Sequence, residues 1–325
     1  MVSSRTVFRA FIASGIAAAC IVGNAAIAQT YPEKPVKLTV GFAPGGALDV
    51  AARILAQKMS EGFGRSVIVE NRTGAGGVIA SSNVAKAEPN GYTVLVIGAI
   101  FAVQAATQKL PFDPVKDFAW ISMVASYPFV MLVRADDKRF ASLGEFIAYA
   151  RRNAGKINFP VVIGSVHHLS GELLNAMAGI DMTPVPVRGG SLPMTEVLSG
   201  RQDMLFNDIM TSKPHILAGK VRPIGVTSLQ PSALLSDVPP IAQSLPGFEV
   251  QTFIGMVAPA GTPSAIVGQL NREVRRVLAL PDIRQKFAEF GGETNPTTPD
   301  DMRKFVTDDI AKWQRVVRDR KLQLQ

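Results

Sequence analysis

The chain has 325 residues, of which 47% are hydrophobic and 18% charged, with a formal net charge of +8 at pH 7. This length accommodates one large domain or two ordinary ones, and the apolar content is too high for intrinsic disorder. One cysteine and three histidines argue against a disulfide framework or a cysteine-based zinc site, and neither a metal nor a cofactor is expected. The Lys and Arg residues are scattered and not interleaved with aromatic residues, so no nucleic acid partner is expected.

Residues 1–28 are typical of a cleaved export signal. Two arginines and no acid precede an apolar stretch, which ends in the small-x-small sequence Ala26-Ile27-Ala28. The alternatives are a membrane anchor, which the interrupted apolar run disfavours, and lipidation of Cys20, which the apolar residues after it disfavour. We predict cleavage after Ala28 and a periplasmic mature protein. That protein has no cysteine, which suits an oxidising compartment.

Strands and helices alternate in the first third of the chain. Val36, Leu38 and Val40 alternate with other residues as in a half-buried strand, and a helix with an apolar stripe follows and ends at Gly62 or Gly64. A short strand is expected at 67–69, a second helix from the Gly74–Gly77 turn to about 86, and a third strand at 92–97. This βαβαβ order predicts a parallel sheet with right-handed crossovers.

The pattern restarts after Tyr127-Pro128. A strand at 129–133 precedes a helix that Ser142 and Glu145 open as a capping box. The tail from Pro263 is predicted to be helical, with Thr298-Pro299 as the start of its last helix. Further strands are expected at 157–162, 183–187, 204–206 and 223–226, with helices near 168–178, 193–198 and 214–218. The sequence therefore predicts two α/β lobes, joined near 126–128 and near 250–253.

The loop Gly41–Gly46 is the first candidate binding element. Its glycines allow a ligand to approach the backbone closely, and the first N–H groups of the following helix have no intrahelical partner. The helix dipole favours an anion there, so a carboxylate can be held without Lys or Arg. A purely structural turn is the alternative. The Lys-Ser/Thr ending of a nucleotide-binding P-loop is missing.

Four other loops are candidates because they also lie between strands and helices. In open α/β sheets ligands bind beyond the carboxyl ends of the strands, so these loops are expected to converge. For the loop 74–77, which is mostly glycine, a packing role is favoured over ligand binding. In the loop 187–191, Arg188 faces either a ligand carboxylate or water. The alternative is a hydrolase that uses Ser165, a histidine, and Asp208 or Glu172 as a catalytic triad. The sequence around Ser165 does not have the usual G-x-S-x-G motif of such enzymes. The four loops are 74–77, 164–168, 187–191 and 206–208.

Several segments carry a family resemblance. In chain order they are Y-P-E-K-P-V-K-L-T-V-G-F-A-P-G-G-A-L-D, V-E-N-R-T-G-A-G-G, N-G-Y-T-V-L-V-I-G, L-P-F-D-P-V-K-D-F, G-E-L-L-N-A-M-A-G-I and V-A-P-A-G-T-P. Together they resemble the Bug-type extracytoplasmic solute receptors of tripartite tricarboxylate transporters. The resemblance implies a type II periplasmic binding-protein fold with two α/β lobes and a two-stranded hinge. Lobe 1 is expected at 29–127 and 253–325, and lobe 2 at 128–252.

The resemblance also implies a function. The protein is expected to be a monomer without enzymatic activity, which captures a small carboxylate by lobe closure and delivers it to membrane transporter subunits. A sensory receptor for a membrane signalling protein is the alternative. The ligand-binding residues it implies are Phe42, Ala43, Gly45, Gly46, Ala99, Gly164, Ser165, His167, Arg188, Gly189, Asn207 and Asp208.

Several of these positions depart from the family pattern. Ala99-Ile100-Phe101 and Val162-Ile163 are less polar than usual, His167 stands where Ser or Thr is common, and Asn207-Asp208 inverts the usual order. We expect a ligand with one carboxylate and an apolar body, aromatic bodies included, in preference to citrate or another polyhydroxylated acid.

Overall fold

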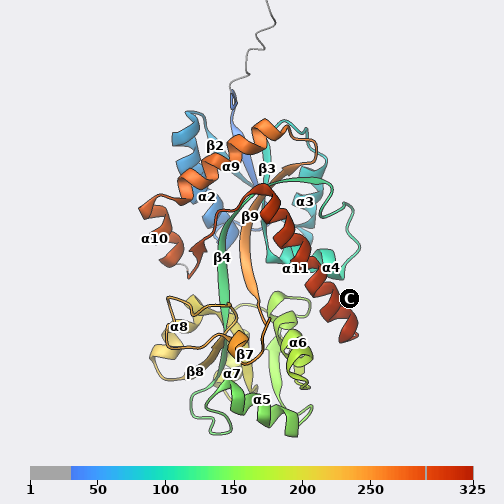
Figure 1. Ribbon diagram of the computed structural model, residues 1–325, viewed down its shortest axis with the longest axis vertical. Coiled ribbons are helices and arrows are strands. Elements are labelled where there is room, and N and C mark those ends of the chain that lie inside the picture. The colour runs from blue at the N-terminus through green and yellow to red at the C-terminus, as the bar shows by residue number, and fades with distance from the viewer. Residues whose placement is uncertain (1–30, 290, 325) are drawn as a thin grey trace, which may run out of the picture. The chain divides into compact units, whose positions relative to one another are not determined.

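The computed structural model describes residues 31–289 and 291–324 (Figure 1). The predicted export signal, 1–28, lies outside the described residues. The helices and strands below belong to the unit Lys34–Gln325. None of the described helices is long and apolar enough to cross a membrane.

The first sheet is built around three parallel strands. β1 (Val36–Val40) lies between β2 (Val67–Asn71) and β3 (Thr93–Gly98) and runs parallel to both, as the βαβαβ order predicts. β9 (Gln251–Pro259) pairs antiparallel with β3, the first half of β4 (Phe118–Arg134) pairs with β9, and the two-residue β10 (Glu293–Thr294) completes the edge.

Helices connect and cover these strands. α2 (Ala47–Phe63) ends at Gly64, whose φ of 62° is the left-handed geometry that glycine adopts at a helix C-terminus. The turn η2 (Ala75–Gly77) opens α3 (Val78–Ala85), and α9 (Ser264–Leu278) and α10 (Pro281–Glu289) follow β9. α9 contacts both α2 and β4.

The sequence analysis did not predict α4 (Ala99–Thr107). Its side chains Ala99, Phe101, Ala102 and Val103 are all buried, so it lacks the polar face that marks an amphipathic helix. Gly98 at its N-cap provides no capping side chain, so the start carries no sequence signal either.

β4 is one continuous strand that serves two sheets (Figure 1). Its predicted start at Phe129 is wrong, because the strand begins at Phe118 and passes through Pro128. Up to Pro128 its partner is β9, and from Phe129 its partners are β7 (Met204–Asp208) and β8 (Val221–Val226), both antiparallel. Proline has no N–H to donate, and it is tolerated here because the strand exchanges partners at this residue.

The second sheet confirms a second α/β unit. β7 and β8 flank the second half of β4, and β5 (Asn158–Val161) and β6 (Thr183–Pro186) form a separate parallel pair. Ser142 caps α5 as predicted by accepting from the Glu145 N–H, while the Glu145 carboxylate accepts from the Ala141 N–H at 2.7 Å. The helices here are α5 (Leu143–Arg152), α6 (Val166–Ala178), α7 (Leu192–Leu198) and α8 (Ile209–Leu217), with the short turn η3 (Ile241–Gln243).

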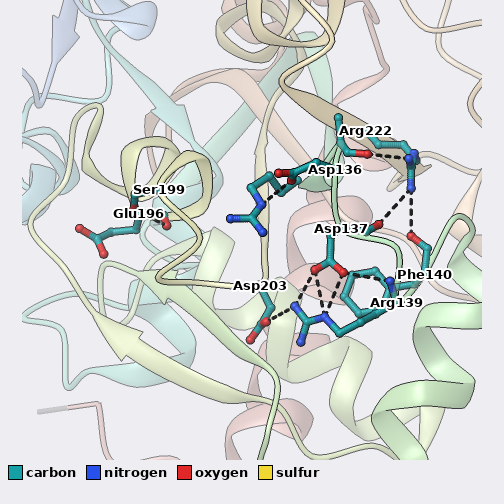
Figure 2. Close-up of polar contacts among 10 residues, drawn as sticks. Asp136, Asp137, Arg139, Phe140, Glu196, Ser199, Asp203 and Arg222 are labelled. Carbon is teal, nitrogen blue, oxygen red and sulfur yellow. Dashed lines mark hydrogen bonds and ion pairs between the residues drawn. The ribbon is translucent and has the colours of Figure 1, made fainter.

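Two arginines fasten the loop that follows β4 (Figure 2). Arg139 Nη2 donates to the carboxylate of Asp137 at 2.6 Å and also contacts Asp203, whose other oxygen accepts from the backbone N–H of Asn158 at 2.8 Å. Arg222 on β8 donates to backbone carbonyls of this loop, among them that of Ala135 at 2.7 Å. Charge-assisted hydrogen bonds therefore join the loop to Arg222 of β8 and to Asp203, the residue before β7, which in turn accepts from β5.

The C-terminal helix α11 (Pro299–Asp319) begins as predicted, since the hydroxyl of Thr298 accepts from the Asp301 N–H at 3.1 Å and Pro299 stands at the first position. Its apolar stripe, which includes the fully buried Trp313, faces the core, and the helix packs on β4 and α4. It also contacts α6, where Arg320 Nε donates to the Glu172 carboxylate at 2.8 Å. α11 thus contacts both α4, which follows β3 of the first sheet, and α6, which lies between β5 and β6.

Candidate functional site

A cavity of about 560 Å³ opens where the two sheets meet along β4 and β9. Its walls come from the N-terminal half of α2, the β3–α4 junction and the N-termini of α6 and α8, together with the two strands and Phe287 of α10. The loops at 41–46, 164–168 and 206–208 therefore converge here, as expected for loops at strand ends, whereas 74–77 and 187–191 contribute no residue to this lining.

Asp49 holds the turn that precedes α2. Its buried carboxylate accepts from the Gly45 N–H at 2.9 Å, from Arg53 Nε at 2.9 Å and from the side-chain amide of Asn71 at 2.8 Å. The same amide donates to the Phe42 carbonyl at 3.0 Å. These hydrogen bonds, with a second one from Arg53 Nη2 to Asp49 at 3.0 Å, therefore fix the conformation of a turn that is otherwise exposed.

This arrangement determines which amides are left to bind an anion. The Gly45 N–H is used by Asp49, and the first i→i−4 bond of α2 runs from the Val50 N–H to the Gly46 carbonyl at 2.9 Å. The N–H groups of Ala47 and Leu48, which precede that bond, have no place in the helical ladder. Both residues line the cavity, at the positive end of the helix dipole.

Replacing Asp49 by Asn is expected to reduce the free energy of unfolding by about 1–3 kcal/mol at pH 7. Hydrogen bonding to Arg53 lowers the pKa of Asp49 to about 2, against the opposing effect of burial. Because this folded-state pKa lies below the ordinary value of 3.8, the stabilisation is complete above about pH 4 and is lost as the pH falls toward 2. Urea unfolding of both proteins from pH 2 to 7 measures the difference.

The control for this prediction is Asp308→Asn, an exposed carboxylate on α11 whose ion pair with Lys304 is solvated, so its loss is expected to cost less than about 1 kcal/mol. If the stability difference between Asp49→Asn and the natural protein stays constant between pH 4 and 2, the ionised carboxylate of Asp49 does not stabilise the turn.

The second glycine turn packs beneath the first. A Cβ on Gly41 would lie 2.6 Å from the Cα of Gly77, so the two backbones touch where no side chain fits. Gln104 of α4 donates to the carbonyls of Ala75 and Gly76 at 3.3 Å each. These contacts support the packing role favoured for this loop.

The N-terminus of α6 is capped internally. The hydroxyl of Ser165 accepts from the His168 N–H at 3.1 Å, and His168 Nδ1 accepts from the Gly164 N–H at 3.2 Å. The His168 ring is buried beside Glu172, and burial lowers its pKa while that carboxylate opposes the effect. His168 is therefore a structural hydrogen-bonding residue.

His167 lies at the cavity wall. Its ring centroid is 4.4 Å from that of Phe129, and its Nε2 is 4.0 Å from the carboxylate of Asp208. Burial lowers the pKa of His167, with Asp208 acting in the opposite direction. The recorded hydrogen bond of the Ser165 hydroxyl is the cap of α6, so the described geometry gives no nucleophile–base pair in favour of the hydrolase alternative.

The predicted binding residues fall into three groups. Five line the cavity, whereas Phe42, Ala43 and Gly46 belong to the turn before α2 without being part of the wall. Gly164, Arg188 and Gly189 lie on the loops of lobe 2 outside the wall, and Asn207 donates to the hydroxyls of Thr211 and Ser212 instead. The five lining residues are Gly45, Ala99, Ser165, His167 and Asp208.

Most of the apolar positions that suggested an apolar ligand do not line the cavity. Ile100 lines the cavity, but Phe101 is buried among aromatic rings of the core, and Val162 and Ile163 are exposed to solvent. Other side chains make the wall apolar instead, and the sequence analysis did not assign them to the site. They include Leu48, Ile54, Tyr127, Phe129, Met210, Phe253 and Phe287.

A signal for some of these residues was present. Tyr127 and Phe253 come from the two segments predicted to join the lobes, and in the structure these segments pair with each other, Tyr127 opposite Thr252. Leu48 and Ile54 lie on α2, where an apolar residue that faces a cavity has the same periodicity as one that faces the core. Nothing in the pattern distinguishes Phe287 of α10.

Two α/β lobes joined by paired strands, with a cavity between them, define the fold as that of a type II periplasmic binding protein. Solved structures share it. A TctC solute-binding protein from Polaromonas, without ligand, has a TM-score of 0.79 at 22% identity, covering 89% of this chain and 99% of that one. The R. palustris protein Rpa4515 with adipate has a TM-score of 0.72 at 34% identity, covering 89% and 97%.

Sequence comparisons identify the family. The family described as "Tripartite tricarboxylate transporter family receptor" matches residues 51–322. A UPF0065 protein from the tcbD-tcbE intergenic region of Pseudomonas sp. is 36% identical over 293 residues, 89% of this chain and 87% of that protein. Protein BugT of Bordetella pertussis is 32% identical over 297 residues, 90% and 91% of the two chains. The chain belongs to the receptor family of tripartite tricarboxylate transporters, which confirms the resemblance.

Proposed function

We propose that this protein is an extracytoplasmic receptor that captures a small carboxylate between its lobes and delivers it to the membrane subunits of a tripartite transporter. One observation carries the proposal: the amides of Ala47 and Leu48 stand at the N-terminus of α2 on a cavity whose described lining contains neither Lys nor Arg. Such amides recognise an anion without a cation. Two relatives support the class, since Rpa4515 was solved with adipate and MatC of Rhodopseudomonas palustris, 31% identical with a TM-score of 0.70, with malate.

Lobe closure provides the mechanism. A ligand that bonds to the α2 amides from lobe 1 and to the N-termini of α6 and α8 from lobe 2 is held best when both lobes touch it, so it stabilises the closed state. We place the hinge where Tyr127 pairs with Thr252, which divides the chain into lobe 1 at 29–127 and 253–325 and lobe 2 at 128–252. The closed surface is what the transporter subunits would recognise.

The wall favours an apolar ligand body. Leu48, Ile54 and Ile100 present hydrocarbon from lobe 1, and the rings of Phe129 and Phe287 complete the surface. Burial of apolar ligand surface against them contributes about 25 cal/mol per Å². A polyhydroxylated acid such as citrate would lose its bonds to water here without replacing them.

Monocarboxylates with an aromatic or branched apolar body are therefore expected to raise the melting temperature by about 5 °C at a concentration 100 times their dissociation constant. Thermal unfolding against a panel of such acids, with citrate and malate included, tests this. Stabilisation by citrate or malate alone would refute the apolar ligand while leaving the receptor function intact. No stabilisation by any carboxylate, together with no carboxylate co-purifying in mass spectrometry, would refute the receptor function.

Export and partnership have tests of their own. Protein recovered from a periplasmic fraction is expected to begin at Gln29 by N-terminal sequencing, since the predicted cleavage follows Ala28. Neighbouring genes for one large and one small integral membrane subunit would support transport, whereas a neighbouring membrane kinase would favour the sensory alternative.

A further inference from the structure

The carboxylate of Asp208 faces the cavity from lobe 2. Asp208 ends β7 and stands at the N-cap of α8, yet its side chain makes no capping hydrogen bond. About half of the side chain is exposed, and it lines the cavity. The side chain is therefore left for something other than the helix that follows it.

Its neighbour Asn207 has a different role. Asn207 donates to the hydroxyls of Thr211 and Ser212 at 3.0 and 2.9 Å and so braces the first turn of α8. Adjacent residues of a strand point to opposite faces, so the order Asn207-Asp208 places the amide on the helix and the acid in the cavity.

Two titratable side chains, an acid and an imidazole, line this end of the cavity. Among the described lining residues, Asp208 is the acid, no Lys or Arg is present, and His167 is the one basic side chain. His167 Nε2 is shielded from solvent, has no hydrogen-bond partner among the described residues and lies 4.0 Å from Asp208 Oδ2. The half-exposed carboxylate of Asp208 is therefore the group that a ligand reaches, and a second ligand carboxylate would meet a like charge there.

We infer that Asp208, which lies beside His167, selects a ligand whose far end donates a hydrogen bond through an ammonium or a hydroxyl group, and disfavours a second carboxylate. The inference rests on the proposed carboxylate binding at α2 and extends it to the other end of the ligand. A hydroxyl or an ammonium group at the far end of the ligand donates to the half-exposed carboxylate of Asp208. The ligand is accordingly an apolar-bodied monocarboxylate with a distal donor, unlike the adipate and malate of the two relatives.

Two matched ligand series test this by calorimetry. The first is hexanoate, 6-hydroxyhexanoate, 6-aminohexanoate and adipate, and the second is benzoate, 4-hydroxybenzoate, 4-(aminomethyl)benzoate and terephthalate. Within at least one series, the hydroxyl or the ammonium compound is expected to bind about tenfold or more tightly than the acid without a distal group, and more tightly still than the diacid. Which of the two donors binds better identifies the natural end group.

Variants separate the outcomes. Asp208→Asn is expected to abolish the preference for an ammonium and to improve binding of the diacid, whereas the exposed Asp136→Asn, at the far end of β4 in the same lobe, is expected to change neither (Figure 2). If a diacid binds most tightly, and Arg188→Met abolishes that binding, the inference is overturned while the receptor function stands. Equal affinities throughout each series, or a preference for the ammonium compound that survives in Asp208→Asn, would also overturn it. No binding in either series would instead count against the α2 carboxylate site.

Discussion

Replacing Ala47 by proline is expected to weaken carboxylate binding by about 10- to 100-fold with little loss of stability. The substitution removes the N–H of a cavity-lining residue in the first turn of α2, and a hydrogen bond to a charged group contributes about 1.5–3 kcal/mol. Proline fits the first position of a helix, and Gly46 before it already has the extended conformation that proline requires, with φ −75° and ψ 165°. Calorimetric titration of both proteins with the tightest monocarboxylate measures the difference.

Ala47→Gly is the matched control, because it also changes this exposed side chain but keeps the N–H. Its affinity is expected to stay within about threefold of the natural protein, a difference of less than 1 kcal/mol. Equal affinity of the proline variant and this control would show that the amide does not bind the carboxylate.

Replacing Arg320 by Met is expected to reduce the free energy of unfolding by about 2–4 kcal/mol, a magnitude lowered from that of a fully buried pair because Arg320 is partly exposed. The Glu172 carboxylate is 1% exposed, and Arg320 Nε at 2.8 Å is its charged partner. Without the guanidinium, a buried charge keeps only the 3.3 Å bond from Asn175 and the 3.9 Å contact with His168. Chemical denaturation measures the loss.

A double-mutant cycle shows whether this effect belongs to the pair. Glu172→Gln in the Arg320→Met background removes the uncompensated charge, so the double variant is expected to be about 1–3 kcal/mol more stable than the sum of the two single losses predicts. Asp181→Asn, which removes the exposed second partner of Arg320, is expected to cost less than about 1 kcal/mol. Additive losses in the cycle would show that α11 and α6 are not coupled through this pair.

Local signals in the sequence predicted much of the fold. The caps at Ser142 and Thr298 are visible because they depend on residues three positions apart, and the parallel β1–β3 core follows from a regular alternation of strands and helices. α4 and the first half of β4 were missed because both are almost wholly buried. A segment without a polar face shows neither the 3.6-residue repeat of a helix nor the two-residue repeat of a strand. In the sequence Pro128 indicates the end of a segment, whereas the strand only changes its pairing partners there.

The sequence allowed us to predict which loops reach the cavity, but not which side chains form its walls. Gly45, Ser165 and Asp208 lie where the chain passes from a strand to a helix, positions that chain order alone assigns to the binding edge. The side chains that shape the cavity, such as Ile54 and Phe287, are apolar residues of ordinary helices, and only the packing of one element against another decides whether they meet a ligand or the core. Asn207 bonds to α8 and Asp208 lines the cavity, and which of the two faces which way likewise depends on how β7 sits in its sheet.

The crystal structure of the protein with its tightest-binding monocarboxylate tests the central claim most directly. The account predicts a carboxylate oxygen within about 3 Å of the amide nitrogens of Ala47 and Leu48, with the lobes closed over the ligand. A carboxylate bound away from the N-terminus of α2, for example against Arg188 with these amides left to water, would contradict it.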